Sequence, residues 1–458
     1  MQEHKTIQSF LDVVAEQIRW KRARPVVTAE LERHLEDQRD AFAEEGHENA
    51  EELAVKEMGD PVSVGTELDR VHRPKPQWGI IALTVIFALA GVLLRIFLTA
   101  GWKEIHMAEN PVKVLVAFGL GCAALLGGYF LDYSRLGHHA GKVYIGTLVV
   151  SIWFLRYSTF INRVPDDVWF MTFYARFFAL IFPVVYALWL YSCRNKGWRG
   201  LTMAILGGVP FALYCYYVPY TLGLIVHLLS GFILVLVASW NDWFGIGRWK
   251  SLLPPLACAG TMTGIFAYGI IELDWSAYRF NVLLHPENYA QGYGFQALMI
   301  REALARSQWM GEGTWDTDNF VFPYERIVPG CESDAFLTTV IYKLGWAPFL
   351  LLTFVFAALM LWLLFRCTKQ KSQLGRLIVV AVVMSLSVQA MVSVVWNMGF
   401  TLLSASFPFI IGNLNTVLNM GLIGLALSVF RGDSIARNSE NSKKERQKIR
   451  VRLVFEKV

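Results

Sequence analysis

The sequence predicts an all-α, polytopic membrane protein with about ten transmembrane helices and a small cytoplasmic helical domain ahead of them. Hydrophobic residues make up 55% of the 458 residues and charged residues only 17%, whereas about a quarter of an average soluble protein is charged. The charges gather in residues 1–76 and 431–458. Between these ends lie apolar runs of about 20 residues, the length at which a helix crosses a hydrocarbon core.

Residues 1–72 predict a compact cytoplasmic domain of short helices. Apolar residues recur at helical spacing in two stretches, at Ile7, Phe10, Leu11 and Val14 and at Leu31, Leu35 and Phe42. Asn49 and Glu52 predict a capping pair. Gly59-Asp60-Pro61 supplies a helix stop, an N-cap and a proline suited to a first helical turn. Residues 73–77, RPKPQ, predict a stiff linker.

Ten apolar segments predict the membrane spans. They cover residues 78–99, 111–132, 142–161, 168–192, 200–217, 219–240, 251–271, 336–365, 377–397 and 402–430. Alternate loops between them carry the basic residues, which are Arg135 and Lys142; Arg194, Lys196 and Arg199; Arg248 and Lys250; and Arg366, Lys369, Lys371 and Arg376. Because Lys and Arg favour cytoplasmic loops, this pattern predicts a multi-pass protein of the cell membrane with both termini cytoplasmic.

Residues 272–335 predict a large external loop between the seventh and eighth spans. A connection of this length is uncommon unless it is functional or disordered, and its many aromatic residues argue against disorder. We therefore expect it to fold back onto the membrane surface. The basic tail, 431–458, suits anionic membrane lipid better than nucleic acid, so no nucleic-acid partner is expected.

The sequence offers no recognisable metal or nucleotide motif. The six cysteines stand singly, without the spacing of a zinc site or a disulfide framework. Nothing matches a P-loop or a dinucleotide-binding fingerprint. ATP-driven and redox chemistry are therefore not suggested, and no metal site is predicted.

From residue 290 onward, several short motifs follow one another in a fixed order. They are Gly292-Tyr293-Gly294-Phe295-Gln296, Gly311-Glu312-Gly313, Pro329-Gly330-Cys331-Glu332-Ser333-Asp334-Ala335-Phe336, Leu344-Gly345, Asn397-Met398-Gly399 and Pro408-Phe409-Ile410. In this order they resemble the SEDS family, the membrane proteins of cell shape, division and sporulation of the FtsW, RodA and SpoVE type. The resemblance covers residues 290–430 through motifs and residues 78–270 mainly through topology. Residues 1–72 resemble the regulatory helical prefixes of the HAAS or permease-prefix type.

The chain also departs from the family pattern. Gly330 and Glu332 stand where the family has a glutamate and a histidine, and Tyr342 and Lys343 stand where it has paired glutamates. The family's S-Y-G-G-S-S is reduced to residues 411–416. These departures mark a divergent member.

The resemblance implies a peptidoglycan glycosyltransferase that polymerises a polyprenyl-pyrophosphate-linked disaccharide at the outer membrane face. It implies a class B penicillin-binding transpeptidase as partner. Asp334 matches the family's loop aspartate, and a carboxylate there could act as general base on the acceptor hydroxyl. The alternative is that Asp334 caps the helix that follows. Two other functional hypotheses remain. The protein could be a catalytically degenerate scaffold or sensor, or it could transport the lipid-linked precursor.

Five further residues are candidates for binding the substrate. Glu332 could share a proton or a divalent cation with Asp334, or be a solvated loop charge. Arg163 and Arg176 could contact the pyrophosphate, although Arg176 could instead snorkel or pair inside its span. Asn397 and Asn413 could bind a ligand or join helices. No cofactor is predicted with certainty, and the divalent cation stays an open alternative.

Overall fold

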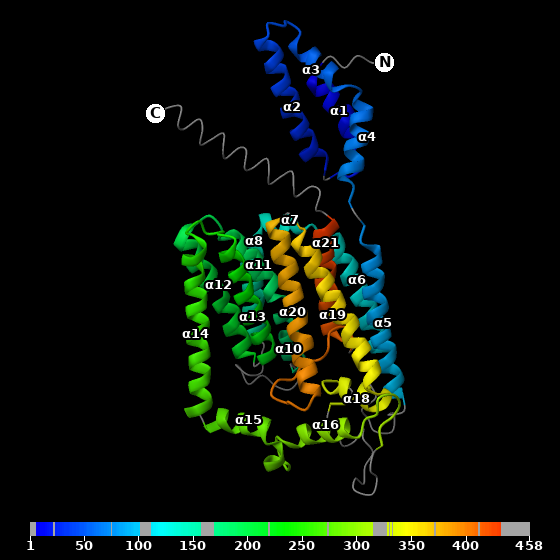
Figure 1. The fold of residues 1–458 in the computed structure, drawn as a ribbon, viewed down its shortest axis with the longest axis vertical. Helices are drawn as coiled ribbons and strands as arrows, with labels where there is room; N and C mark the ends of the chain where they lie inside the picture. The colour runs from blue at the N-terminus through cyan, green and yellow to red at the C-terminus, as the bar shows by residue number, and fades with distance from the viewer. Residues whose placement is uncertain are drawn as a thin grey trace. The chain divides into compact units, whose positions relative to one another are not determined.

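The structure is a computed structural model and describes residues 6–21, 23–74, 76–100, 111–156, 169–218, 220–272, 274–314, 328, 330–331, 333–370, 372–410 and 413–431. Within this part of the chain all regular elements are helices, which confirms the all-α prediction. The chain divides into two compact units, one built on Met1–Gln77 and the other on Trp78–Lys369 and Leu374–Ser428 (Figure 1). Each unit is described by itself below.

The first unit consists of four helices around a small core. They are α1 (Ile7–Gln17), α2 (Arg24–Glu44), α3 (Ala50–Met58) and α4 (Pro61–His72). Phe10, Val14 and Leu35 are fully buried in that core. Asp60 caps α4 as predicted, since its side chain accepts a hydrogen bond of 2.9 Å from the Ser63 N–H. Asn49 precedes α3 but makes no side-chain capping bond, so the capping pair predicted there is wrong.

The second unit contains the long apolar helices. Its elements are α5 (Trp78–Thr99), α6 (Pro111–Phe130), α7 (Tyr133–His138), α8 (Ala140–Arg156), α10 (Trp169–Phe178), η3 (Ala179–Ile181), α11 (Phe182–Ser192), α12 (Gly197–Tyr217), α13 (Thr221–Trp240), α14 (Arg248–Glu272), α15 (Asp274–Leu284), η4 (Pro286–Tyr289), α16 (Phe295–Ala305), α18 (Phe336–Leu344), α19 (Trp346–Thr368), α20 (Gln373–Asn397) and α21 (Leu414–Arg431).

Eight helical segments of the described chain are long and apolar enough to cross a membrane, which makes this a multi-pass membrane protein. They are Trp78–Thr99, Pro111–Phe130, Tyr174–Ser192, Gly197–Tyr217, Thr221–Trp240, Trp346–Thr368, Gln373–Asn397 and Leu414–Arg431. The other two predicted spans correspond to α8, of 17 residues, and α14, of 25 residues. Both stand beside the other long helices (Figure 1).

The predicted span 336–365 is interrupted. Gly345 adopts a φ of +102° and separates the short α18 from α19. A side chain at Gly345 would also meet the Trp309 carbonyl oxygen, 2.5 Å from an ideal Cβ. The spanning helix is therefore α19 alone, because only glycine readily takes this backbone conformation in so close a contact.

The first part of the predicted span 402–430 is not helical. Residues 400–410 form turns and irregular backbone, and the helix begins only at Leu414. Pro408 cannot donate a helical hydrogen bond, and Phe409 has a φ of +72°. Irregular backbone survives near a bilayer where protein buries it, and here Ala405, Phe407 and Phe409 are buried.

Helix α21 fits tightly against its neighbours. An ideal Cβ on Gly424 would lie 2.1 Å from the Leu125 carbonyl oxygen, and one on Gly128 would lie 2.5 Å from that of Gly421, so α6 and α21 approach backbone to backbone. On another side, the amides of Gln389 and Asn419 exchange two hydrogen bonds, of 3.3 and 3.1 Å, between α20 and α21.

We call the end of this unit that carries α15, α16 and α18 the loop end. There α15 and α16 run across the ends of the long helices (Figure 1), and α16 packs against α18. The predicted loop 272–335 thus contains helices where it is described, and it covers the bundle at this end. The candidate site lies at the loop end.

Candidate functional site

Asp334 occupies a turn that leads into α18. The carbonyl oxygen of Gly330 accepts hydrogen bonds from the N–H groups of Ser333 and Ala335, at 2.9 and 2.8 Å. The N-cap residue of α18 is Ala335, and it makes no side-chain capping bond. Asp334 therefore does not serve as the helix cap that the alternative interpretation predicted.

The carboxylate of Asp334 instead faces the segment between α20 and α21. Ser404 donates a short hydrogen bond to Asp334 Oδ2, and Ser406 donates one of 3.2 Å to Oδ1. Asp334 is half-buried and Ser404 is exposed. The carboxylate is thus held by two hydroxyl groups while one side stays accessible, as a general base that must reach an incoming hydroxyl would need.

Asn397, at the end of α20, holds the backbone on which Asp334 sits. Its Nδ2 donates to the carbonyl oxygens of Asp334 and Ser393, both at 2.8 Å. Its Oδ1 accepts from the N–H and the hydroxyl of Thr338, at 2.7 and 2.9 Å. The side chain is fully buried. All of its polar atoms are thus engaged inside the protein, which suits a positioning role better than direct ligand binding.

Arg176 and Tyr220 complete this neighbourhood. Arg176 lies on α10, and its buried Nε makes no hydrogen bond with the described residues. Tyr220 precedes α13 and is half-buried. The charges of Asp334 and Arg176 both act on the Tyr220 phenol, so a carboxylate and a cation lie in the same part of the loop end.

The remaining candidates lie apart or outside the described residues. Asn413 caps α21, since its Oδ1 accepts a hydrogen bond of 2.9 Å from the Asn415 N–H. Arg163 and Glu332 lie outside the described residues. In the described chain, no group of three or more His, Cys, Asp or Glu side chains could hold a metal ion.

Sequence reasoning did not identify Ser404, Ser406 or Tyr220. Ser404 and Ser406 stand two residues apart just before Pro408-Phe409. In extended backbone, that spacing puts both hydroxyls on one face. The assumption that residues 402–430 form one helix hid this signal.

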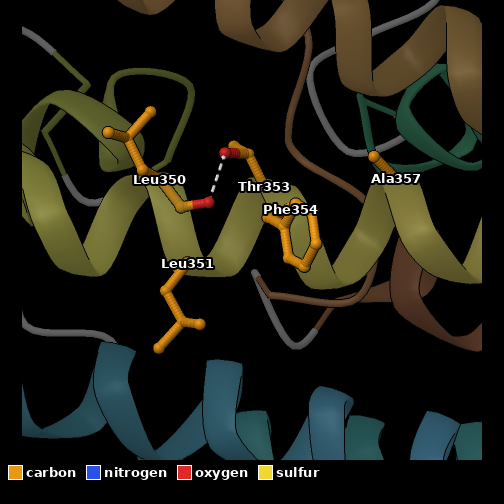
Figure 2. Close-up of a pocket in the computed structure, with 5 residues that line it drawn as sticks. All are labelled: Leu350, Leu351, Thr353, Phe354 and Ala357. Carbon is orange, nitrogen blue, oxygen red and sulfur yellow. Dashed lines mark hydrogen bonds between the residues drawn. The ribbon is translucent and has the colours of Figure 1, made fainter.

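A second hollow, on α19, carries no such chemistry. Figure 2 shows it lined by Leu350, Leu351, Thr353, Phe354 and Ala357, with a volume of about 590 Å³. The only hydroxyl there, that of Thr353, donates back to the Phe349 and Leu350 carbonyl oxygens at 2.9 and 3.1 Å. The hollow is apolar and lies on a helix that crosses the membrane, so it suits a hydrocarbon surface.

Known proteins match this chain through structure only. No family model matches it, and no curated protein matches it. One chain of a solved peptidoglycan synthase complex, described for its structural coordination of polymerization and crosslinking, is similar over 78% of this chain and 98% of its own. The TM-score is 0.55 at 15% sequence identity. At that identity the likeness establishes a shared fold, and the activity must be argued from the residues.

Proposed function

We propose that this protein acts in cell-wall synthesis as a SEDS-like peptidoglycan glycosyltransferase, which polymerises a polyprenyl-pyrophosphate-linked disaccharide at the outer face of the membrane. The observation that carries the proposal is the arrangement of Asp334. Its carboxylate is held by Ser404 and Ser406, its backbone is held by Asn397, and Arg176 lies in the same region.

The chemistry follows from this arrangement. An acceptor sugar hydroxyl attacks the anomeric carbon of the donor as the bond from that carbon to the lipid pyrophosphate breaks. Asp334 accepts the proton of the attacking hydroxyl. Arg176 stabilises the negative charge that develops on the departing pyrophosphate. A class B penicillin-binding transpeptidase is the proposed partner, because the fold is shared with a chain of a peptidoglycan synthase complex.

The test is glycan polymerisation from purified lipid-linked disaccharide, alone and with a class B transpeptidase. We expect Asp334→Asn, which keeps the shape but replaces one accepting oxygen with an amide donor and removes the basic carboxylate, to lower the rate by about 100-fold or more. Glu302→Gln is the matched control, since Glu302 is a half-exposed carboxylate of the loop end that pairs with Arg306. It should polymerise at the wild-type rate. Equal loss in both variants would remove Asp334 from the catalytic role.

A degenerate scaffold or sensor is the second candidate, and one observation favours it. Tyr342 and Lys343 replace the paired glutamates of the family and serve packing instead. Tyr342 is buried against Gly313, and Lys343 pairs with Glu312 at 2.7 Å. No polymer from folded wild-type protein that still binds the lipid-linked disaccharide would favour the scaffold over the enzyme.

A further inference from the structure

Tyr220 carries a hydroxyl group that the protein itself does not use. The residue is half-buried directly before α13. Its Oη makes no hydrogen bond with the described residues, and it is not one of their fully buried, unpartnered polar atoms. The hydroxyl is therefore open to a water-sized group. A phenol is neutral at neutral pH and can donate one hydrogen bond, so Tyr220 offers a free donor.

The backbone and ring of Tyr220 are both held in place. Its N–H donates to the Cys215 carbonyl oxygen, and its own carbonyl oxygen accepts from the Leu224 N–H, both at 3.0 Å. An ideal Cβ on Gly223 would lie 2.4 Å from Cδ1 of the ring, so the ring fills the space that a side chain there would need. A donor presented from a fixed position loses little conformational freedom when it binds a ligand.

The packing of the ring places Tyr220 beside both halves of the candidate site. The ring packs against an apolar cluster that contains Ala175, the residue before Arg176. It also packs against a second apolar cluster, which contains Ala405. Ala405 stands between the two serines that hold the carboxylate of Asp334. This packing agrees with the charges of Arg176 and Asp334, which both act on the phenol.

The polar groups around the hydroxyl select an anionic ligand. The two terminal nitrogens of Arg176 make no hydrogen bond with the described residues and are not among their buried, unpartnered atoms, so they too are open. The carboxylate of Asp334 accepts from two serine hydroxyls and takes no bond from Tyr220. A free phenol donor near an open guanidinium group matches phosphate oxygens, because hydrogen bonds to ionised acceptors are the strong ones.

We propose that Tyr220 is a further substrate-binding residue, whose hydroxyl donates a hydrogen bond to the pyrophosphate of the lipid-linked disaccharide beside Arg176. This inference rests on the proposed function. When the bond between the anomeric carbon and the pyrophosphate oxygen breaks, the electron pair stays on the pyrophosphate. Tyr220 keeps its proton and its hydrogen bond strengthens as that charge develops. The proton of the acceptor hydroxyl goes to Asp334, so the two residues have separate roles.

The test measures the dissociation constant of a short polyprenyl pyrophosphate from the full chain in detergent. The polyprenol of the same length, which lacks the anion, is the second ligand. Tyr220→Phe removes only the hydroxyl, which has no protein partner, so it should unfold at the wild-type temperature. We expect it to weaken binding of the pyrophosphate by about tenfold or more and to leave binding of the polyprenol unchanged.

Tyr289→Phe is the matched control. Tyr289 is another half-buried tyrosine of the loop end, and its ring packs edge-on against that of Tyr278, with 4.9 Å between the ring centres. This variant should bind both ligands like wild type.

A double-mutant cycle with Arg176→Gln tests whether the two side chains bind the same group. If they do, the effect of Tyr220→Phe should be smaller by about threefold or more in the Arg176→Gln background, because residues that share a partner are not additive. Fully additive effects would show that they bind different groups and would contradict the proposal.

The outcomes separate this inference from the proposed function. Wild-type affinity for the pyrophosphate in Tyr220→Phe overturns the inference, and polymerisation by the wild-type protein then still supports the enzyme. Selective loss of pyrophosphate binding in a protein that makes no polymer keeps the inference and favours the scaffold. Equal loss for the polyprenol would give Tyr220 a packing role only. Displacement of the pyrophosphate by phosphatidylglycerol and not by phosphatidylcholine in nanodiscs would assign the donor to bulk lipid headgroups, against the proposal.

Discussion

Asn397 joins three parts of the loop end through a single side chain. It connects the end of α20 to the turn of Asp334 and to the first turn of α18, with four hydrogen bonds of 2.7–2.9 Å. Because the side chain is fully buried, water cannot replace these bonds when it is removed. The position of Asp334 thus depends on a residue that need not touch a substrate.

Asn397→Ala is expected to destabilise the protein by about 1–3 kcal/mol, since the Thr338 N–H and the Asp334 carbonyl lose buried partners. Thermal unfolding of the detergent-purified chain measures this change. Asn288→Ala is the control, because Asn288 is exposed at the same end of the unit. An unchanged midpoint for Asn397→Ala would show that the bonds do not contribute. A polymerisation rate that falls more than the folded fraction would separate positioning from stability.

At this scale, the sequence predicted that Asp334 and Asn397 belong to one site, but not how they contact each other. The ordered motifs singled out Asp334 and Asn397, and the structure brings them together. The sequence could not predict that the Asn397 side chain accepts a hydrogen bond from the N–H of Thr338, which lies 59 positions away. Nor could it pair Asp334 with Ser404 and Ser406, because sequence spacing carries no information on contacts across 70 or more positions.

At the scale of elements, Asp69 ties α4 to the end of α1. It is buried, accepts a hydrogen bond of 2.9 Å from the Arg19 N–H, and pairs with Arg73 at 2.8 Å. Burial by itself raises the pKa of Asp69, but the bonds and charges of Arg73 and Arg19 outweigh it, so the pKa is lowered. The ionised form is therefore the one that stabilises the fold.

The sign of the pH dependence follows from this lowered pKa. The stabilisation is fully present above the unfolded-state pKa of about 3.9 and is lost as the pH falls through the lower folded-state value. We expect hydrogen exchange in α1 and α4 of the full chain to accelerate as the pH falls through that window. Exchange rates are compared after correction for intrinsic pH dependence. Asp69→Asn should exchange faster at neutral pH and lose the acid transition. An acid transition that persists in Asp69→Asn would assign it to another group.

Helix boundaries were predictable where hydrophobicity alone decides them. The predicted span 78–99 coincides with α5, Trp78–Thr99. The predictions 336–365 and 402–430 were wrong in part, because both continued an apolar run through a residue that stops a helix. Gly345 and Pro408 were visible in the sequence. Only the structure shows that the helix is interrupted at Gly345 and that no helix forms before Leu414.

For the whole molecule, the orientation in the membrane remains a prediction from the basic loops. In a background with its six cysteines replaced, single cysteines introduced as Glu287→Cys and Lys196→Cys test it. Both parent residues are exposed. A membrane-impermeant maleimide should label the former in intact cells and the latter only after permeabilisation, because Lys and Arg favour the cytoplasmic side. The reverse labelling would invert the topology and remove the external site.

The fold class of the whole molecule was predictable because apolar length and charge distribution are global properties of the sequence. The similarity to a chain of a peptidoglycan synthase complex at 15% identity agrees with that prediction. For residues 272–335 the sequence predicted only a folded loop, and not the helices α15 and α16 that run across the loop end. Short helices of mixed composition lack the strong periodic signal of a membrane span.

The close fit of α21 has a consequence for biogenesis. A span that carries Asn415 and Asn419 is a poor substrate for insertion into lipid by itself. Its glycines and amides match surfaces of α6 and α20 that are made earlier in the chain. We therefore expect α21 to insert against the surfaces of α6 and α20, which are already synthesised when it emerges. A nascent chain arrested before residue 414 would leave the Gln389 amide without its Asn419 partner and be marked for quality control.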